Sequence, residues 1–178
     1  MPQNEAVKQY GIVKGDVGKI APNLINRDFA AKQPNEKWAI DITEFSLFGK
    51  KLYLSTILDL YISEVISYTI SHHPRLSLVM NMLNQAVEWL PQQHTLILHS
   101  DQGWHYHMKA YQRVLEANHI QQSMSRKGNC MGNPYRRISS VFSSPSFCTF
   151  SSSIPLSILF RSCMITCTGI TIREPRLS

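Results

Sequence analysis

Cysteine is scarce in this 178-residue sequence, and no two cysteines are paired in a motif. The four that occur all lie after residue 129, and none forms a CxxC pair: Cys130, Cys148, Cys163 and Cys167. This pattern supports neither a disulfide framework nor a zinc site. The N-terminus lacks a basic segment followed by an apolar stretch, so we expect no signal peptide and a cytoplasmic location.

A long uninterrupted hydrophobic run is also missing. The most apolar stretch, residues 154–172, contains Arg161 and many hydroxyl side chains. A charge and several polar groups in the middle of such a stretch make it a poor membrane span. We therefore expect no association with a membrane.

Acidic residues are nearly absent from the C-terminal part. Residues 1–133 hold 13 Lys and Arg against 11 Asp and Glu, so 13 − 11 = +2. Residues 134–178 hold five Arg and one acid, Glu174, so 5 − 1 = +4, and lysine does not occur after Lys127. Most of the positive charge thus lies outside the part that is patterned like a domain. Residues 134–178 show no sustained hydrophobic period, and we predict that they are disordered.

Residues 1–36 are polar and rich in glycine and proline, which indicates a linker or arm. A domain is predicted over residues 37–133, because hydrophobic periodicity begins there. Three alternating or β-branched runs are followed by a helical stripe, a short apolar run, a second helical stripe and a last short strand. These segments are residues 37–45, 52–62, 64–71, 77–90, 95–101, 108–118 and 120–124.

The predicted order is β-β-β-α-β-α-β, which describes an α/β domain with a mixed sheet. The ribonuclease H-like architecture has this order, and it needs one more helix after Asn133. Ser77 is expected to cap the first helix, and Pro91 to close it.

Two aspartates occupy positions where a carboxylate is costly unless it is paired, hydrogen-bonded or bound to a metal. Asp41 lies in the middle of the first predicted strand, and Asp101 ends a short apolar strand. If these strands are neighbours, the two carboxylates meet, and hard oxygen ligands of this kind suit Mg²⁺. A pair of metals can then promote phosphoryl transfer. Spacing alone leaves a turn or cap role open for each aspartate.

Other polar residues suggest weaker alternatives. His72-His73 and His105-x-His107 can ligate metal, which would suit a metal hydrolase, but neither pair has a partner at a convincing spacing. For nucleic acid, Trp104 can stack on an unpaired base. Three cations can contact phosphates, namely Lys109, Arg126 and Lys127.

Several strings resemble the catalytic core of insertion-sequence transposases, specifically the OrfB-type protein of the IS-three family, whose core is similar to retroviral integrases. They are NEKWAIDITEF, KLYLSTILDLY, LILHSDQGWHY and QSMSRKGNC. The resemblance covers about residues 10–133. It implies a ribonuclease H-like fold, a triad of two aspartates and a glutamate, and cutting and joining of DNA that depends on Mg²⁺ or Mn²⁺. Asp41 and Asp101 match the first two acids, and the motif brings Arg126 and Lys127 close to the site.

The resemblance places the third acid at position 137, where this sequence has Arg137. No carboxylate occurs between Glu116 and Glu174. The codons of residues 136–146, read from the last base of Arg136, permit Glu-Asn-Phe-Phe-Gly-Leu-Leu-Lys-Ser-Glu, which is similar to the family's own continuation. We therefore hypothesise a frameshift just before Arg137, which the nucleotide sequence of the gene tests directly.

Two functions follow as expectations. The first is a DNA-transposing enzyme, with this copy inactive because its third acid is missing and its final helix is lost to an aberrant tail. The second is a non-catalytic remnant that binds DNA, forms a homo-oligomer or pairs with intact transposase.

Overall fold

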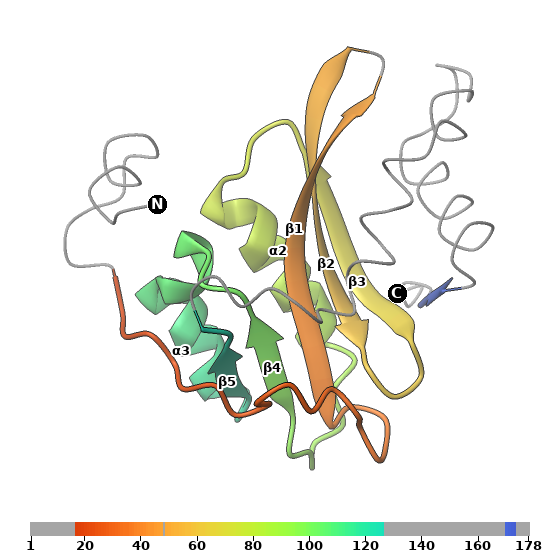
Figure 1. Cartoon of the computed structure of the whole chain (residues 1–178), viewed down its shortest axis with the longest axis vertical. Coiled ribbons are helices and arrows are strands. Elements are labelled where there is room, and N and C mark those ends of the chain that lie inside the picture. Colours follow the sequence, from red (N-terminus) through yellow and green to blue (C-terminus); the bar gives the residue numbers. More distant parts are fainter. Residues whose placement is uncertain (1–16, 48, 127–169, 174–178) are drawn as a thin grey trace.

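The computed structural model describes residues 17–47, 49–126 and 170–173 (Figure 1). Among the described residues, three strands come first, and helices and strands follow, with one short 3-10 helix. They are β1 (Lys37–Leu47), β2 (Lys50–Asp59), β3 (Glu64–Ser71), α2 (Leu76–Val87), β4 (Ile97–Ser100), η1 (Trp104–His107), α3 (Lys109–Ala117), β5 (Gln121–Met124) and β6 (Thr171–Ile172).

The strands among these residues form one mixed sheet with the order β5-β4-β1-β2-β3-β6. β1, β2 and β3 are a meander of antiparallel neighbours, as their alternating sequences predict. β4 lies parallel to β1, and β5 lies parallel to β4. Parallel strands need a crossover connection, and here α2 leads from β3 to β4 and α3 leads from β4 to β5. The predicted order β-β-β-α-β-α-β is confirmed, and β6 is an addition to it.

Both helices pack on one face of the sheet. The cluster there joins even-numbered residues of β1, such as Trp38 and Ile40, to Met82 of α2 and Tyr111 of α3. All four side chains are almost completely buried. Burial of this apolar area is the main force that fixes the register of the central strands, because a one-residue slip would turn these side chains to the other face.

The opposite face carries a second cluster, formed partly by odd-numbered residues of β1. Ala39, Phe45 and Leu47 lie in it, together with residues of β2 and β3. Ile170 and Ile172, which flank and form β6, also belong to this cluster. Asp41 lies in the same strand at an odd-numbered position, so its side chain shares the face of Ala39 and Phe45.

Two details of the first helix and the tail differ from expectation. α2 begins at Leu76 with Arg75 as its N-cap and has no side-chain cap, so the predicted cap at Ser77 is wrong. Residues 170–173 of the segment predicted to be disordered include β6, and Arg173 bonds Glu64 with an Nη2–Oε2 distance of 3.0 Å. The remainder of that segment, including the position of the lost final helix, lies outside the described residues.

Residues 17–36 form an extended arm that packs on the domain (Figure 1). Ile25 is buried, and the Leu24 N–H donates to Ser123 Oγ at 3.0 Å. Buried Lys37, at the start of β1, donates from Nζ to the carbonyls of Asp28 and Ala30 at 2.9 and 2.7 Å. These contacts hold the arm against the β5 and β4 side of the sheet.

The helices in the described part of the chain are too short or too polar to cross a lipid bilayer.

Candidate active site

Two neighbouring parallel strands carry the two aspartates. The β1–β4 register pairs Trp38 with Leu98 and Ala39 with His99. Asp41 lies two residues beyond Ala39, and Asp101 lies two residues beyond His99, directly after β4 ends. The strands are therefore adjacent, which fulfils the condition on which the sequence argument for a pair of carboxylates depended.

The negative charge of Asp101 affects the ionisation of Asp41. Burial and, second, repulsion from the Asp101 carboxylate raise the pKa of Asp41 from 3.8 to about 7, while a backbone hydrogen bond from Ile42 opposes the rise. Without a counterion, an acid in this position is thus half protonated near neutral pH. Two carboxylates that repel each other in a half-buried site bind a cation favourably, because the cation removes the repulsion.

The turn after β4 holds Asp101 in place. The Gly103 N–H donates to Asp101 Oδ1 at 2.8 Å. A β-carbon at Gly103 would lie 3.0 Å from that oxygen and 3.1 Å from the Tyr106 ring, so the turn is too tight for a larger residue. Gln102 Nε2 donates to the Ser125 carbonyl at 3.1 Å, and the Ser125 N–H donates to the Ser100 carbonyl at 2.9 Å. The ends of β4 and β5 are thereby tied together beside the acid.

Three buried histidines surround this turn. His99 Nδ1 lies 2.8 Å from Ser123 Oγ, and His105 Nε2 lies 2.8 Å from the Pro74 carbonyl. Burial lowers the pKa of His99, His105 and His107, and the Asp101 charge opposes the lowering in each case. The contacts of His99 and His105 are those of packed core residues, whereas the buried Nε2 of His107 has no hydrogen-bond partner among the described residues.

The histidine pairs do not gather into a metal site in this part of the chain. Among the residues that the structure describes, no group of three or more His, Cys, Asp and Glu side chains is arranged to hold a metal ion. His72 and His73 are exposed and distant in sequence from the acid turn. The histidine-based hydrolase thus has no ligand set here.

Asp59, at the end of β2, is a carboxylate with a structural role. It is fully buried and accepts four hydrogen bonds, two on each oxygen. Oδ2 accepts from the Asn35 N–H at 2.8 Å and from Trp38 Nε1 at 3.1 Å. Oδ1 accepts from the N–H groups of Tyr61 and Ile62 at 2.8 and 3.3 Å. Its oxygens are used within the fold, so it is a poor candidate for a ligand.

The predicted nucleic-acid contacts lie in different surroundings. Arg126 follows β5 and is exposed near the acid turn, whereas Lys109 is exposed at the start of α3. Trp104 stacks on the His105 ring with centroids 3.8 Å apart, so one face of its indole is covered. Lys127 lies outside the described residues.

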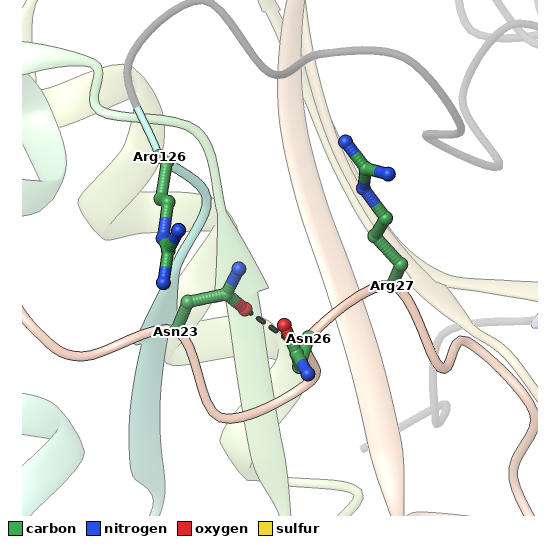
Figure 2. A pocket seen from close by; sticks show the side chains of 4 residues that line it. All are labelled: Asn23, Asn26, Arg27 and Arg126. Atoms are coloured by element: carbon green, nitrogen blue, oxygen red, sulfur yellow. Dashed lines mark hydrogen bonds between the residues drawn. The ribbon is translucent and has the colours of Figure 1, made fainter.

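A polar hollow beside Arg126 was missed by the sequence reasoning. Besides Arg126 it is lined by Asn23, Asn26 and Arg27 of the arm (Figure 2). The signal in the sequence was slight, because two asparagines and an arginine in a polar segment look like any linker. Only the folding of the arm back onto β5 brings them to the site.

The family of the chain follows from comparison with known proteins. Residues 31–130 match the integrase core domain family. The chain belongs to this family. It is 54% identical over 128 residues to the putative transposase InsK for insertion sequence element IS150 of Escherichia coli K12, which covers 71% of this chain and 45% of that protein.

Two further relatives support the same placement. An uncharacterized transposase-like protein of Haemophilus influenzae is 52% identical over 126 residues, which cover 71% of this chain and 58% of that protein. Transposase InsF for insertion sequence IS3A of E. coli K12 is 34% identical over 114 residues, which cover 64% and 40%. The integrase core here is thus of the IS3-family transposase type. The chain spans about half the length of the first two of these curated relatives.

Solved structures show the fold. The HTLV-2 integrase catalytic core domain in complex with magnesium has a TM-score of 0.61 at 17% identity, covering 82% of this chain and 93% of that one. The catalytic core domain of BIV integrase has a TM-score of 0.54 at 12% identity, covering 74% and 82%. The ribonuclease H-like fold predicted from the sequence is therefore confirmed.

Proposed function

We propose that this chain is the catalytic-core part of an insertion-sequence transposase and that Asp41 and Asp101 would hold a divalent cation, Mg²⁺ or Mn²⁺. The observation that carries the proposal is the parallel pairing of β1 with β4, which brings Asp41 close enough to Asp101 for the Asp101 charge, after burial, to raise the Asp41 pKa. A related core, that of HTLV-2 integrase, is known in complex with magnesium. Oxygen ligands of this kind are the ones that Mg²⁺ prefers.

Each residue of the site has a separate task in this proposal. When bound, the cation would activate an oxygen nucleophile and stabilise the leaving oxygen at a phosphodiester. Asp41 supplies a ligand from the rigid middle of β1. Asp101 supplies one from the turn after β4, where the Gly103 N–H keeps its Oδ1 in position. Gln102 fixes the turn to the end of β5.

We further propose that this copy does not cut DNA. No carboxylate occurs in the sequence between Glu116 and Glu174, so the segment after β5 supplies no third acid. Arg137 would repel a cation where a glutamate would attract it. The hypothesised frameshift before Arg137 accounts for both the missing acid and the change of composition after it.

A non-catalytic role is the second candidate. The cation Arg126 beside the acid turn favours binding of DNA without cleavage. Such a remnant would act in the cytoplasm on insertion-sequence ends or target DNA, as a homo-oligomer or together with an intact transposase.

A nicking assay tests the proposal. The chain would be incubated with supercoiled plasmid and Mg²⁺ or Mn²⁺, beside a repaired chain whose residues from 137 onward follow the shifted reading and begin with glutamate. We expect no nicking by the chain above its Asp101→Asn variant. We expect nicking by the repaired chain that its own Asp101→Asn variant loses.

Two results would contradict the proposal. Metal-dependent nicking by the unrepaired chain that Asp101→Asn abolishes would show that no third acid is needed. A repaired chain that neither nicks nor binds Mn²⁺ more tightly than the original, measured by calorimetry, would contradict the assignment of the acid pair.

A further inference from the structure

The outer edge of β3 carries a short parallel strand from the far end of the chain. This strand is β6, drawn in blue in Figure 1, and it pairs with Glu64 and Val65 at the start of β3. Arg173 continues the pairing, because its N–H donates to the Val65 carbonyl at 3.0 Å. Backbone hydrogen bonds of this kind attach an extended segment to the edge of a sheet, and its side chains then decide specificity.

The side chains of the segment alternate between the two faces of the sheet. Ile170 and Ile172 enter the cluster on the face opposite the helices and are only 4% and 9% exposed. Arg173 Nε donates to Glu64 Oε2 at 3.1 Å, and Arg173 Nη2 lies 3.0 Å from the same oxygen. The Arg173 guanidinium carbon also lies 5.5 Å from the centre of the Trp89 ring, which is a cation–π distance. Four residues thus make apolar, ionic and aromatic contacts together.

The edge favours a cation at the position of Arg173. The register of β2 with β3 places Glu64 directly across from Asp59. Like charges that are directly opposed destabilise a sheet, so a cation beside Glu64 relieves the repulsion. The ion pair with Arg173 is partly buried, since the Arg173 and Glu64 side chains are 24% and 20% exposed. It is therefore screened less than an ion pair on the surface.

A bulge limits how much of β3 the segment uses. In the register of β2 with β3, Leu58 pairs with Val65 and Ile57 pairs with Ser67, so Ile66 is an extra residue. Such a bulge bends the strand and increases its twist. The pairing of β6 with β3 ends at Val65, directly before the bulge. Because the ladder is short, the side chains of a segment decide whether it fits.

The residues that receive the segment belong to the integrase core part of the chain. Glu64, Val65 and Trp89 lie within residues 31–130, which match that family. Residues 170–173 instead lie in the part of the sequence with few acids and no lysine. The edge therefore offers its backbone groups, apolar cluster and acid to any extended segment of matching chemistry. A segment on the same chain has an advantage, because the covalent connection raises its effective concentration.

We propose that the start of β3, with Glu64, Val65 and Trp89, is a binding site for an extended peptide in which two isoleucines at alternate positions are followed by an arginine. Residues 170–173 occupy this site as an internal ligand and cover an edge that would otherwise be a template for pairing with another chain. The inference does not rest on the acid pair of the proposed function, so each can fail without the other.

Fluorescence anisotropy with a labelled peptide of residues 168–175 tests the inference on the full chain. The peptide, TGITIREP, is used unchanged and with Arg173→Glu. The chain is used in its original form, as Arg173→Glu, which weakens the internal ligand, and as Glu64→Arg, which reverses the charge of the site. We expect the Arg173→Glu chain to bind the unchanged peptide about tenfold more tightly than the original chain does, because its own segment no longer competes.

The charge-reversed chain separates recognition from folding. We expect Glu64→Arg to prefer the peptide with glutamate by about tenfold, which is the reverse of the preference of the Arg173→Glu chain. A misfolded chain would not reverse the preference. The matched control is Glu116→Arg/Arg173→Glu, which reverses an exposed acid of α3 and should keep the preference for the unchanged peptide.

Three results would overturn the inference. Equal binding of the two peptides by both charge variants would show that Glu64 does not recognise the arginine. Absence of peptide binding by the Arg173→Glu chain would show that the start of β3 is not a binding site for this peptide. A dimer of the original chain, measured by light scattering, that Arg173→Glu dissociates would place the segment of a second copy on the edge instead of the chain's own.

Discussion

Asp59 and Asp41 are carboxylates on adjacent strands of one sheet, and their surroundings differ in one respect. Asp59, at the end of β2, is fully buried and accepts four hydrogen bonds. Asp41, in the middle of β1, is half-buried, and burial and then the Asp101 charge raise its pKa, while a single backbone hydrogen bond from Ile42 opposes the rise. The surroundings of Asp59 supply its carboxylate with hydrogen-bond donors, whereas those of Asp41 place a second carboxylate, Asp101, near the first.

The comparison separates a structural acid from a candidate ligand without reference to sequence position. Donors that surround Asp59 lower the free energy of the folded chain. Within the site, the electrostatic cost at Asp41 and Asp101 is offset only in part, by the backbone N–H groups of Ile42 and Gly103, and a cation from solution would offset the remainder. Sites that store unfavourable electrostatics of this kind are typical of function.

The largest effect on stability should come from changing the hydrogen-bonded carboxylate of Asp59. Asp59→Asn replaces one oxygen by an NH₂ group, which must face either the Asn35 and Trp38 donors or those of Tyr61 and Ile62. We expect a loss of about 3 kcal/mol in the free energy of unfolding, measured by urea denaturation. Glu44→Gln, which removes an exposed ion pair to Lys51, is the control and should leave the midpoint unchanged. A loss of unfolding free energy in Asp59→Asn no greater than that in Glu44→Gln would contradict the structural role of Asp59.

A substitution at Asp41 is expected to change stability in the opposite direction. The folded pKa of Asp41, about 7, is above its ordinary value of 3.8, so the folded chain retains a proton that the unfolded chain has released between these values. The contribution of this group to stability therefore falls as pH rises from about 4 to about 7. Asp41→Asn removes the penalty.

We expect Asp41→Asn to be more stable than the original chain at pH 8, by on the order of 1–2 kcal/mol, and to lose that advantage near pH 4. Thermal melts in EDTA at both values measure it, with ~2–4 °C expected per kcal/mol for a chain of this length. A variant that is less stable than the original at pH 8 would show that Asp41 is supported by its surroundings as Asp59 is.

A smaller effect should follow from adding cation. With two carboxylates as the only acidic ligands, we expect weak binding, so that ~10 mM Mn²⁺ stabilises the chain by less than about 1 kcal/mol at pH 8. Asp101→Asn should remove the shift, whereas Glu44→Gln should keep it. An equal shift in both variants would place the bound ion elsewhere.

The strands and helices of the domain could be predicted from the sequence because their hydrophobic periods are clear. The alternation in β1 reflects two faces that pack in different clusters, the stripe in α2 reflects burial of one face of the helix, and the structure has both. Adjacency of the strands that carry Asp41 and Asp101 was only a condition of the sequence argument, because β2, β3 and α2 separate them in the chain, and the structure supplies it through the β1–β4 pairing.

The rest depended on contacts between segments distant in sequence. Docking of the arm uses single hydrogen bonds such as Leu24 N–H to Ser123 Oγ, which leave no periodic pattern. The left-handed turn at Asn26 and Arg27 contains no glycine, which is the usual sequence signal for this backbone conformation. β6 is a two-residue strand in a segment without a hydrophobic period, so its pairing with β3 had no signal.

The most direct test is the titration of the Asp41 side chain by carbon-13 NMR in the metal-free chain and in Asp101→Asn. The account predicts a pKa of about 7 for Asp41 in the original chain and a lower pKa in the variant, because the repelling charge is gone. A pKa near 3.8 that is the same in both chains would contradict it, since the two carboxylates would then not form one site.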